Sequence, residues 1–240
     1  MKSLLSELGP AVVINLKSRE DKKKYIIDHF NQHGVTDYSF FDAVDGRAFG
    51  NTYKMSPGQI GCAMSHILVI SKWLNESSGS YLLVMEDDIC LDNVKFWSWS
   101  WEEFIKKINF DFDIIQLSTW PYTIKTTRDL GKNSLPHKLL TTAYLISRSG
   151  AKQIIDKTFQ DGKIKLDFND TSNIADHSLL YKNVKKCYTI PFFSPTTKFL
   201  SDIDTDSQVA ELQKMESQRT SGIWQTNSLS IDEILELYKN

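Results

Sequence analysis

The stretch AVVINLKSREDKKKYIIDHFNQHG, residues 11–34, predicts a buried strand followed directly by a helix. Its opening run, residues 11–16, is mainly apolar and rich in β-branched side chains, as in strands that are covered on both faces. In the segment that follows, Ser18 is a suitable N-cap, apolar side chains recur at helical spacing, and Gly34 suits the position just beyond the helix end. A strand, a tight turn and a helix in this order form the repeating unit of an α/β fold.

The same alternation continues along the chain. A helix is expected over residues 57–75, because Ser56 and Gln59 form a capping box and Pro57 occupies the first helical position. The other expected elements are strands at 38–44, 81–86, 112–118 and 141–147 and a short helix near 100–108. Strands that alternate with helices indicate a mainly parallel sheet with helices on both faces.

The pattern weakens after residue 160. The expected elements there are a short helix at 173–183, an edge strand in CYTIPF (187–192) that ends at Pro191, a loop at 195–208 and a terminal helix at 229–238 that begins with the capping box of Ser230 and Glu233. We therefore expect one domain over residues 1–240, with its core at about 11–203 and a helical appendage at about 204–240.

Composition excludes several classes of protein. The chain has 240 residues, of which 41% are hydrophobic and 24% charged, which is typical of globular proteins. A formal net charge of −2 gives no electrostatic reason to expect nucleic acid or an anionic membrane as a partner. The basic runs at 22–24 and 185–186 are expected to be solvated. Cys62, Cys90 and Cys187 are too scattered for a disulfide framework or a zinc site of paired cysteines, and are expected to be buried thiols.

The N-terminal segment MKSLLSELGPAVVINL is interrupted by Glu7, Gly9 and Pro10, which is unlike a signal peptide. The sequence also lacks a run of roughly 18 apolar residues, the length that a membrane-spanning helix needs. We therefore expect a cytoplasmic protein with at most peripheral membrane association.

Three adjacent carboxylates end the strand expected at 81–86. The segment YLLVMEDDIC runs from apolar residues straight into Glu86, Asp87 and Asp88. Neighbouring like charges repel, and burying a carboxylate without a partner is costly. Ligands of open α/β sheets bind beyond the carboxyl ends of the strands, where Mg²⁺ or Mn²⁺ would accept these oxygens. Alternatively, two of the carboxylates face solvent and the third caps the next turn.

Aromatic residues suggest where a sugar acceptor would bind. Trp97, Trp99 and Trp101 alternate in FWSWSW, so they share one face of an extended segment. They form either a stacking platform for an acceptor or a group packed against the sheet edge. Trp120 and Tyr122 follow the next expected strand, at the same end of the sheet as the carboxylates, and are predicted acceptor-site residues.

Several motifs together resemble glycosyltransferase family 25, which includes bacterial lipooligosaccharide galactosyltransferases and animal collagen galactosyltransferases. The similar segments are VINLKSREDKKKY (13–25), DG (45–46), GCAMSHILVISKW (61–73), LLVMEDDI (82–89), TTAYLISRSGA (141–151), ADHSLLY (175–181) and SDI (201–203). They follow the order of the family over roughly residues 12–203. The chain departs from the family at Lys22 and Lys23, where a second arginine is common, and at the start of TTAY.

The resemblance implies a GT-A fold, a UDP-hexose donor carrying galactose or glucose, inversion at the anomeric carbon, and a Mn²⁺ or Mg²⁺ cofactor. The implied acceptor is a glycan, a glycolipid of the lipopolysaccharide type or a collagen-like protein. Asp88 would be the principal metal ligand, and Glu86 or Asp87 would reach the ribose, the metal or its bound water. The other implied donor-site residues are Asn15 and Arg19 near the base and ribose, Asp45, and Ser65 with His66 at the cleft border.

An inverting transfer needs a general base that deprotonates the acceptor hydroxyl. Asp176 is the candidate base, although an acidic residue that favours a helix N-terminus is the alternative. His177 would complete the metal sphere, or it is structural. His66 is either a ligand contact or a satisfied buried histidine, and Ser65 can instead make a bond back within its helix.

Two other functions compete with a transferase. A catalytically inactive module that binds nucleotide or glycan would not need the carboxylate triplet together with Asp176, and the chain has both. A Mg²⁺-dependent phosphohydrolase would carry an aspartyl nucleophile in a D-x-D arrangement near the first strand, and VINLKSR contains no aspartate. The sequence therefore favours the transferase.

Overall fold

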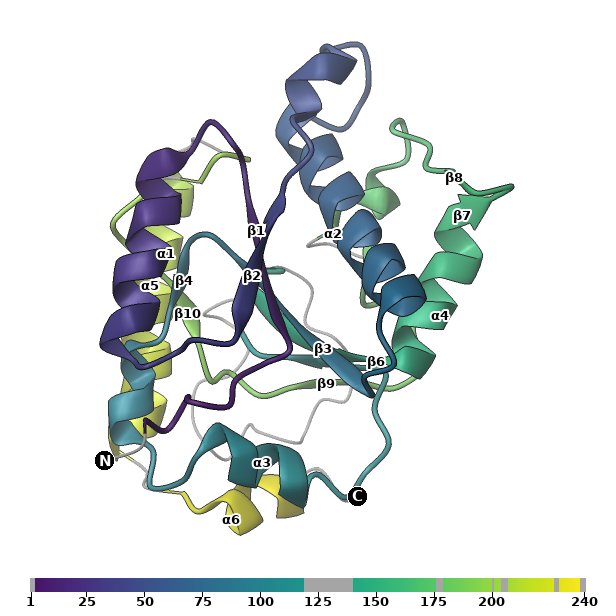
Figure 1. Ribbon diagram of the computed structural model, residues 1–240. Helices are drawn as coiled ribbons and strands as arrows, with labels where there is room; N and C mark the ends of the chain where they lie inside the picture. The colour runs from purple at the N-terminus through teal and green to yellow at the C-terminus, as the bar shows by residue number, and fades with distance from the viewer. Residues whose placement is uncertain are drawn as a thin grey trace.

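The computed structural model describes residues 3–118, 140–175, 179–199, 201–203, 207–226 and 229–237. At its centre is a six-stranded sheet with the order β2-β1-β3-β6-β5-β9 (Figure 1). The strands are β1 (Ala11–Asn15), β2 (Tyr38–Asp42), β3 (Tyr81–Glu86), β5 (Ile114–Gln116), β6 (Ala143–Ser147) and β9 (Cys187–Thr189). Only β6 runs antiparallel to its neighbours in this sheet, so the predicted mainly parallel sheet is confirmed.

Helices cover both faces of the sheet, as predicted. They are α1 (Glu20–Gln32), α2 (Pro57–Glu76), α3 (Trp101–Lys107), α4 (Arg148–Thr158), α5 (Ser207–Thr226) and α6 (Ile231–Glu236). In Figure 1, α1 and α5 lie on one side of the sheet, α2 and α4 lie on the other, and α3 and α6 meet at one end.

Shorter elements complete the fold. They are the 3-10 helices η1 (Gly46–Phe49), η2 (Asp92–Phe96) and η4 (Thr171–Asn173), the strand pair β4 (Ile89–Cys90) with β10 (Ser194–Pro195), and the pair β7 (Phe159–Gln160) with β8 (Lys163–Ile164). The short helix expected at 173–183 lies partly outside the described residues.

The strand β3 shows why the central strands are apolar along their whole length. Successive side chains of a strand point to opposite faces. Leu83 therefore packs in the core on the α1 side together with Phe30, whereas Val84 packs on the α2 side together with Ile70. Full burial of one such side chain contributes about 1.5–3 kcal/mol.

The helix ends follow local rules, with one exception. In α2 the backbone N–H of Gln59 donates to Ser56 Oγ (3.3 Å), and the Gln59 side chain accepts from the Ser56 N–H (2.9 Å). The second predicted capping box, at the start of α6, is also present. Gly34 follows α1 with a φ of +68°, as expected beyond a helix end. Ser18 is wrong as the N-cap of α1, because a turn that joins Leu16 to Arg19 (2.7 Å) delays the helix by one residue.

The alternating tryptophans belong to the core. Trp97 and Trp99 stack with ring centroids 4.2 Å apart, and both rings also contact Phe192. Trp101 packs beside Phe193, and none of the three tryptophans is more than 6% exposed. Packing is therefore the correct alternative, and an acceptor platform at these residues is excluded.

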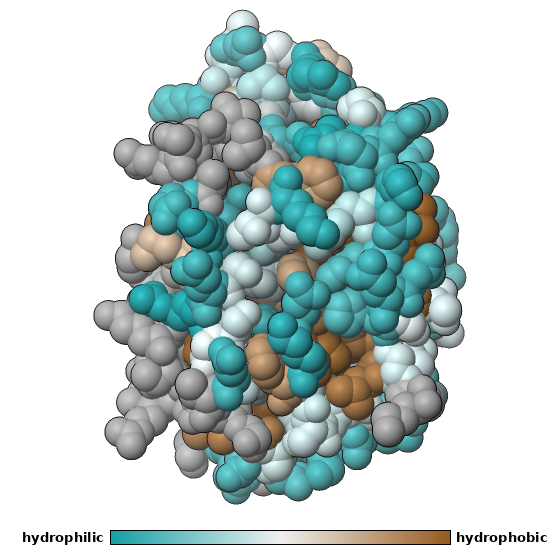
Figure 2. Space-filling model, turned by 90° about the vertical axis from the view of Figure 1, so that its left-hand side faces the viewer, coloured by the Kyte–Doolittle hydropathy of each residue, from teal (hydrophilic) through white to brown (hydrophobic). Residues whose placement is uncertain are grey.

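The surface over α1 is mostly hydrophilic, and hydrophobic side chains emerge mainly in its lower half (Figure 2). Lys185 and Lys186 are exposed, as predicted for a solvated basic run. In the run at 22–24 the prediction is wrong for Lys22, which is buried. Within the described residues, no helix combines the length and apolar character needed to cross a membrane.

Candidate functional site

A cleft of about 250 Å³ lies beyond the carboxyl ends of β1 and β3, beside η1 and the start of α2. The sequence-predicted residues that line it are Arg19, Asp45, Ser65, His66, Glu86, Asp87 and Asp88. Asn15 lies next to this lining, bonded to Asp87. The structure thus brings these predicted residues together. Asp176, His177, Trp120 and Tyr122 lie outside the described residues.

Two adjacent parallel strands place the first polar contact of the site. Ile14 of β1 pairs with Glu86 of β3, so the residues after each strand meet at the same edge of the sheet. There the Asn15 side-chain amide donates to Asp87 Oδ2 over 2.8 Å. The Asn15 amide also donates to the carbonyl oxygen of Arg19 (3.2 Å), which fixes the start of α1.

Two glycines hold η1 against α2. A Cβ atom on Gly46 would lie 1.6 Å from the Pro57 carbonyl oxygen, and one on Gly61 would lie 2.5 Å from the Val44 carbonyl oxygen. Neither distance is possible between real atoms. The glycines of the DG and GCAM motifs therefore allow this backbone contact, which carries Asp45 into the cleft lining.

The group that neutralises the carboxylates includes Lys22. Its Nζ lies 3.1 Å from Asp87 Oδ1 and 2.6 Å from Asp202 Oδ2, with 3% of the side chain exposed. Burial alone would lower the pKa of Lys22, but the carboxylates of Asp88, Asp87 and Asp202 outweigh it and raise the pKa. A buried ammonium thus takes part of the place that the sequence suggested for a metal ion.

Asp87 is fully engaged within the protein. One carboxylate oxygen bonds to Lys22 and the other to Asn15. Burial raises its pKa, although Lys22 and Asn15 oppose the rise. Asp87 therefore ties α1 to the end of β1, and neither of its oxygens is left without a bond.

Glu86 is held by a buried chain of hydrogen bonds. Its Oε1 accepts from Thr141 Oγ1 (2.5 Å) and lies 3.0 Å from His66 Nε2. Because an ionised carboxylate can only accept, Nε2 is the donor, and His66 Nδ1 then accepts from the Tyr144 hydroxyl (3.0 Å). Burial would raise the pKa of Glu86, but the bonds from His66 and Thr141 lower it overall. His66 is thus the satisfied buried histidine of one alternative, and it also lines the cleft.

Asp88 differs from its two neighbours. Its Oδ1 is buried and has no hydrogen-bond partner among the described residues. Burial raises its pKa to about 7, and the nearby carboxylates of Glu86 and Asp87 add to the rise against the opposing charge of Lys22. A buried oxygen without a partner is costly. It is what a carboxylate that binds a cation would leave.

Charge supports the same conclusion. The cleft lining contains three cationic side chains, Arg19, Lys22 and Arg47, and five anionic ones, Asp45, Glu86, Asp87, Asp88 and Asp202, which gives a formal charge of −2 (3 − 5). A divalent cation would neutralise it, and Mg²⁺ and Mn²⁺ prefer such carboxylate oxygens. The residues therefore fit a hard divalent metal, held first by Asp88.

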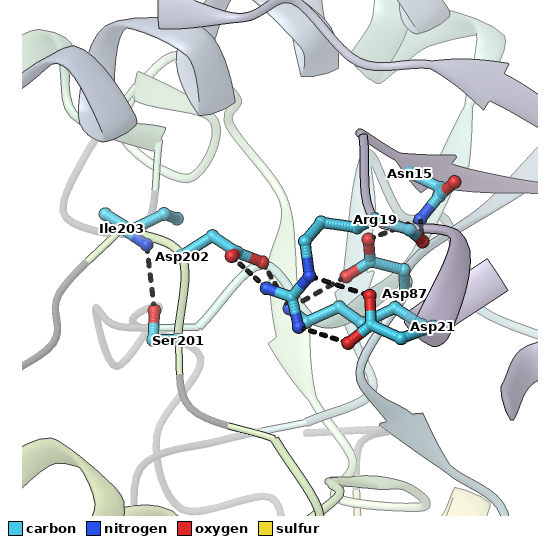
Figure 3. Close-up of polar contacts among 8 residues, drawn as sticks. Asn15, Arg19, Asp21, Asp87, Ser201, Asp202 and Ile203 are labelled. Carbon is cyan, nitrogen blue, oxygen red and sulfur yellow. Dashed lines mark hydrogen bonds and ion pairs between the residues drawn. The ribbon is translucent and has the colours of Figure 1, made fainter. Parts of the chain in front are cut away.

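Arg19 and Asp202 close one side of the cleft (Figure 3). The guanidinium forms two bonds with Asp21, at 2.9 and 2.8 Å, and also contacts Asp202. Asp202 in turn bonds to Lys22, so one carboxylate bridges the two cations at the start of α1.

Ser65 and Asp45 have local bonds of their own. The Ser65 hydroxyl donates to the Gly61 carbonyl oxygen (2.6 Å), which is the bond back within the helix that the sequence left open. It also accepts from the backbone N–H of Val44 (2.8 Å). Asp45 caps η1 by accepting from the Arg47 N–H (3.0 Å) and pairs with the Arg47 guanidinium.

Sequence reasoning missed Lys22, Thr141 and Tyr144 as parts of the site, and it saw Asp202 only within a motif. Helical spacing could have revealed Lys22, because it lies four residues before the buried Ile26 on the same face of α1. Cys62 was predicted to be buried like Cys90 and Cys187, but it is half-buried because it lines the cleft.

Sequence comparison finds relatives among glycosyltransferases. The family model described as "Glycosyltransferase family 25 (LPS biosynthesis protein)" matches residues 9–169. A Haemophilus influenzae protein assigned as a glycosyltransferase is 24% identical over 218 residues, which cover 80% of this chain and 74% of that protein. A protein of Acanthamoeba polyphaga mimivirus with the same assignment is 36% identical over 90 residues, which cover 32% of this chain and 28% of the viral protein.

Two solved structures share the general architecture at low sequence identity. A glycosyltransferase involved in the glycosylation of the major capsid of PBCV-1 has a TM-score of 0.41 and 8% identity, covering 75% of this chain and 80% of that one. The inositol-1-phosphate CTP transferase from T. maritima has a TM-score of 0.39 and 13% identity, covering 85% of this chain and 94% of that one.

Proposed function

Because the chain belongs to glycosyltransferase family 25, we propose that it transfers galactose or glucose from a UDP-sugar to a hydroxyl group of an acceptor. The transfer inverts the anomeric carbon and depends on Mn²⁺ or Mg²⁺. The observation that carries the proposal is the buried, unpartnered oxygen of Asp88 in a cleft with a formal charge of −2. The acceptor is a glycan, a glycolipid of the lipopolysaccharide type or a collagen-like protein.

The chain's own residues would bind and orient the donor. Arg19 and Lys22 bring two positive charges to the cleft, where the diphosphate would lie. Asn15 and Arg19 are assigned to the base and ribose. Glu86 holds one oxygen in bonds to His66 and Thr141, which leaves its second oxygen for a ligand in the cleft.

A divalent cation held by Asp88, with Glu86 close by and His177 as a further candidate ligand, would stabilise the negative charge of the departing diphosphate. Asp88 is suited to hold it, because its oxygen is already removed from water and has no competing bond among the described residues. Lys22 and Asn15 keep Asp87 in place beside it.

Inversion requires a base on the acceptor side of the cleft, opposite the leaving diphosphate. Asp176 is proposed for this role, and Trp120 with Tyr122 is proposed to contact the acceptor. These assignments rest on the sequence motifs. A cytoplasmic location with at most peripheral membrane association is part of the same proposal.

Donor turnover tests the proposal. Purified protein is incubated with UDP-galactose or UDP-glucose and Mn²⁺, and UDP release and the anomer of the freed sugar are followed by NMR. We expect slow metal-dependent hydrolysis with inversion, abolished in Asp88→Asn and retained in Asp28→Asn, where an exposed carboxylate is lost instead. UDP binding without any turnover or transfer would instead favour the inactive binding module.

A further inference from the structure

Three side chains of the kind that bind zinc meet in one wall of the cleft. Cys62 and His66 lie one turn apart on α2, and Glu86 ends β3. One ligand atom from each, a sulfur, a ring nitrogen and a carboxylate oxygen, all lie within 4.8 Å of one another. Thiolate, imidazole and carboxylate are the ligands of protein-bound Zn²⁺.

The surroundings of this cluster are those of a supported metal site. The Tyr144 hydroxyl lies 3.0 Å from His66 Nδ1, the ring nitrogen that points away from Glu86. Thr141 Oγ1 bonds to Glu86 Oε1 at 2.5 Å and lies 4.0 Å from Cys62 Sγ. Such outer partners orient metal ligands and are found around most histidine sites.

The cluster is also accessible. Cys62, His66 and Glu86 all line the cleft, so an ion can reach them from solvent. Three protein ligands leave one position of a tetrahedral ion open toward the cleft, as in catalytic zinc sites.

We propose that Cys62, His66 and Glu86 form a site for Zn²⁺ or another thiophilic divalent ion. A thiolate ligand selects such ions over Mg²⁺ and Mn²⁺. The site therefore differs in chemistry from the oxygen site at Asp88, and the two ions would not compete for the same donor set.

Binding balances protons without any electron transfer. The Cys62 thiol releases its proton to solvent and binds as the thiolate. The His66 proton moves from Nε2 to Nδ1, where the Tyr144 oxygen accepts it, and the ion takes the former place of that proton between His66 and Glu86. In a tetrahedral zinc site, ligand atoms lie about 3.3–3.6 Å apart. The His66–Glu86 contact of 3.0 Å therefore opens slightly while Cys62 moves closer.

The ion would change how the cleft binds its substrate. It would replace the hydrogen bond that holds Glu86 and occupy space beside it. On the proposed function, Zn²⁺ would therefore weaken binding of the UDP-sugar and inhibit transfer. Inhibition by Zn²⁺ in the presence of saturating Mn²⁺ is the expected consequence.

Cobalt spectroscopy tests the site directly. Co²⁺ is titrated into metal-free protein, and the thiolate-to-cobalt charge-transfer band in the near ultraviolet is recorded. We expect the band in the wild type and in Cys187→Ser, a matched loss of a buried thiol on β9, and no band in Cys62→Ser. Tyr144→Phe should weaken Zn²⁺ binding about 10–100-fold in competition with a chromophoric chelator.

A second measurement avoids any loss of folding in a variant. Alkylation of Cys62 in the wild type is followed by mass spectrometry with and without Zn²⁺, and we expect Zn²⁺ to slow it. The proposal is overturned if the wild type gives no charge-transfer band, if the band survives in Cys62→Ser, or if Zn²⁺ leaves alkylation unchanged.

The two proposals fail in different ways. In Asp88→Asn we expect the cobalt–thiolate band to persist while Mn²⁺-dependent UDP binding is lost. UDP binding without a cobalt band would overturn the zinc site alone. A cobalt band without UDP binding in any condition would overturn the donor assignment and leave the zinc site standing.

Discussion

The ammonium of Lys22 lies 3.1 Å from Asp87 and 2.6 Å from Asp202, and so joins the end of β3 to the segment at 201–203. The three carboxylates after β3 consequently have separate roles. Asp87 pairs with Lys22, Glu86 is held by His66 and Thr141, and Asp88 retains a buried oxygen for a cation.

Lys22→Met tests the weight of this ion pair. Removing one partner leaves buried carboxylates without their counter-charge, which costs about 3–5 kcal/mol in buried pairs. We expect the free energy of unfolding, measured with urea, to fall by about that much. Lys24→Met, which removes an exposed lysine paired with Asp28, should change it by about 0.5 kcal/mol or less. Equal effects of the two substitutions would contradict a buried ion pair at Lys22.

Thr141→Val tests whether the hydrogen bond to Glu86 matters for the donor. Thr158→Val is the matched control, because both threonines are 2% exposed and Thr158 bonds only within α4, to the Ile154 carbonyl oxygen. Each substitution should cost about 1 kcal/mol of stability. We expect UDP binding, measured by calorimetry, to weaken in Thr141→Val alone. A similar loss in Thr158→Val would mean that the effect is one of stability rather than of orientation at Glu86.

Gly46→Ala tests the contact between η1 and α2. The new methyl group would meet the Pro57 carbonyl oxygen, so the backbone would have to move and carry Asp45 with it. We expect lower thermal stability and weaker UDP binding. Gly222→Ala in α5 meets no atom within 4 Å and should instead stabilise the protein by about 0.5–1 kcal/mol. A stable Gly46→Ala protein with unchanged binding would show that this contact does not position the cleft.

His29 gives a prediction for pH. Its Nε2 accepts from the Leu91 backbone N–H (2.9 Å), and burial, aided by the charge of His33, lowers its pKa to about 4 from 6.5. The unfolded chain therefore takes up a proton between these values that the folded protein refuses, so stability is present above pH 6.5 and is lost as pH falls through 4. We expect the free energy of unfolding to drop by about 2–3 kcal/mol over this window.

The control for this prediction is His29→Gln. Glutamine has no titrating ring, so the pH dependence between about 6.5 and 4 should become shallower than in the wild type. An unchanged slope in this variant would assign the acid sensitivity to other groups.

Local patterns were enough to predict most of the central fold. The apolar run of β1, the capping boxes of α2 and α6, and Gly34 after α1 depend on neighbours in sequence, and all were found as expected. These features follow from backbone geometry and hydrogen bonding within a few residues.

The 20-residue helix α5 could not be located from periodicity. Its buried face carries Gln213, Glu216 and Thr220 at helical spacing, so polar residues occupy positions where a hydrophobic pattern would mark a buried helix. Lys22 was missed for a related reason, because the charges at 22–24 suggested a solvated run although Lys22 shares a face with Ile26.

The location of the site was predictable, but the separate roles within it were not. Three adjacent carboxylates after an apolar strand indicated a ligand site at the strand end. Their different states depend on partners far along the chain, such as His66, Thr141 and Lys22. No local pattern connects such residues, because the sheet and its helices bring them together only in the folded protein.

The most direct test of the central claim is calorimetric titration of UDP, with and without Mn²⁺, into the wild type, Asp88→Asn and the control Asp28→Asn. We predict Mn²⁺-dependent binding in the wild type and in Asp28→Asn, and its loss in Asp88→Asn. UDP binding that is independent of Mn²⁺, or equal in Asp88→Asn and the wild type, would contradict a metal-assisted nucleotide site at Asp88.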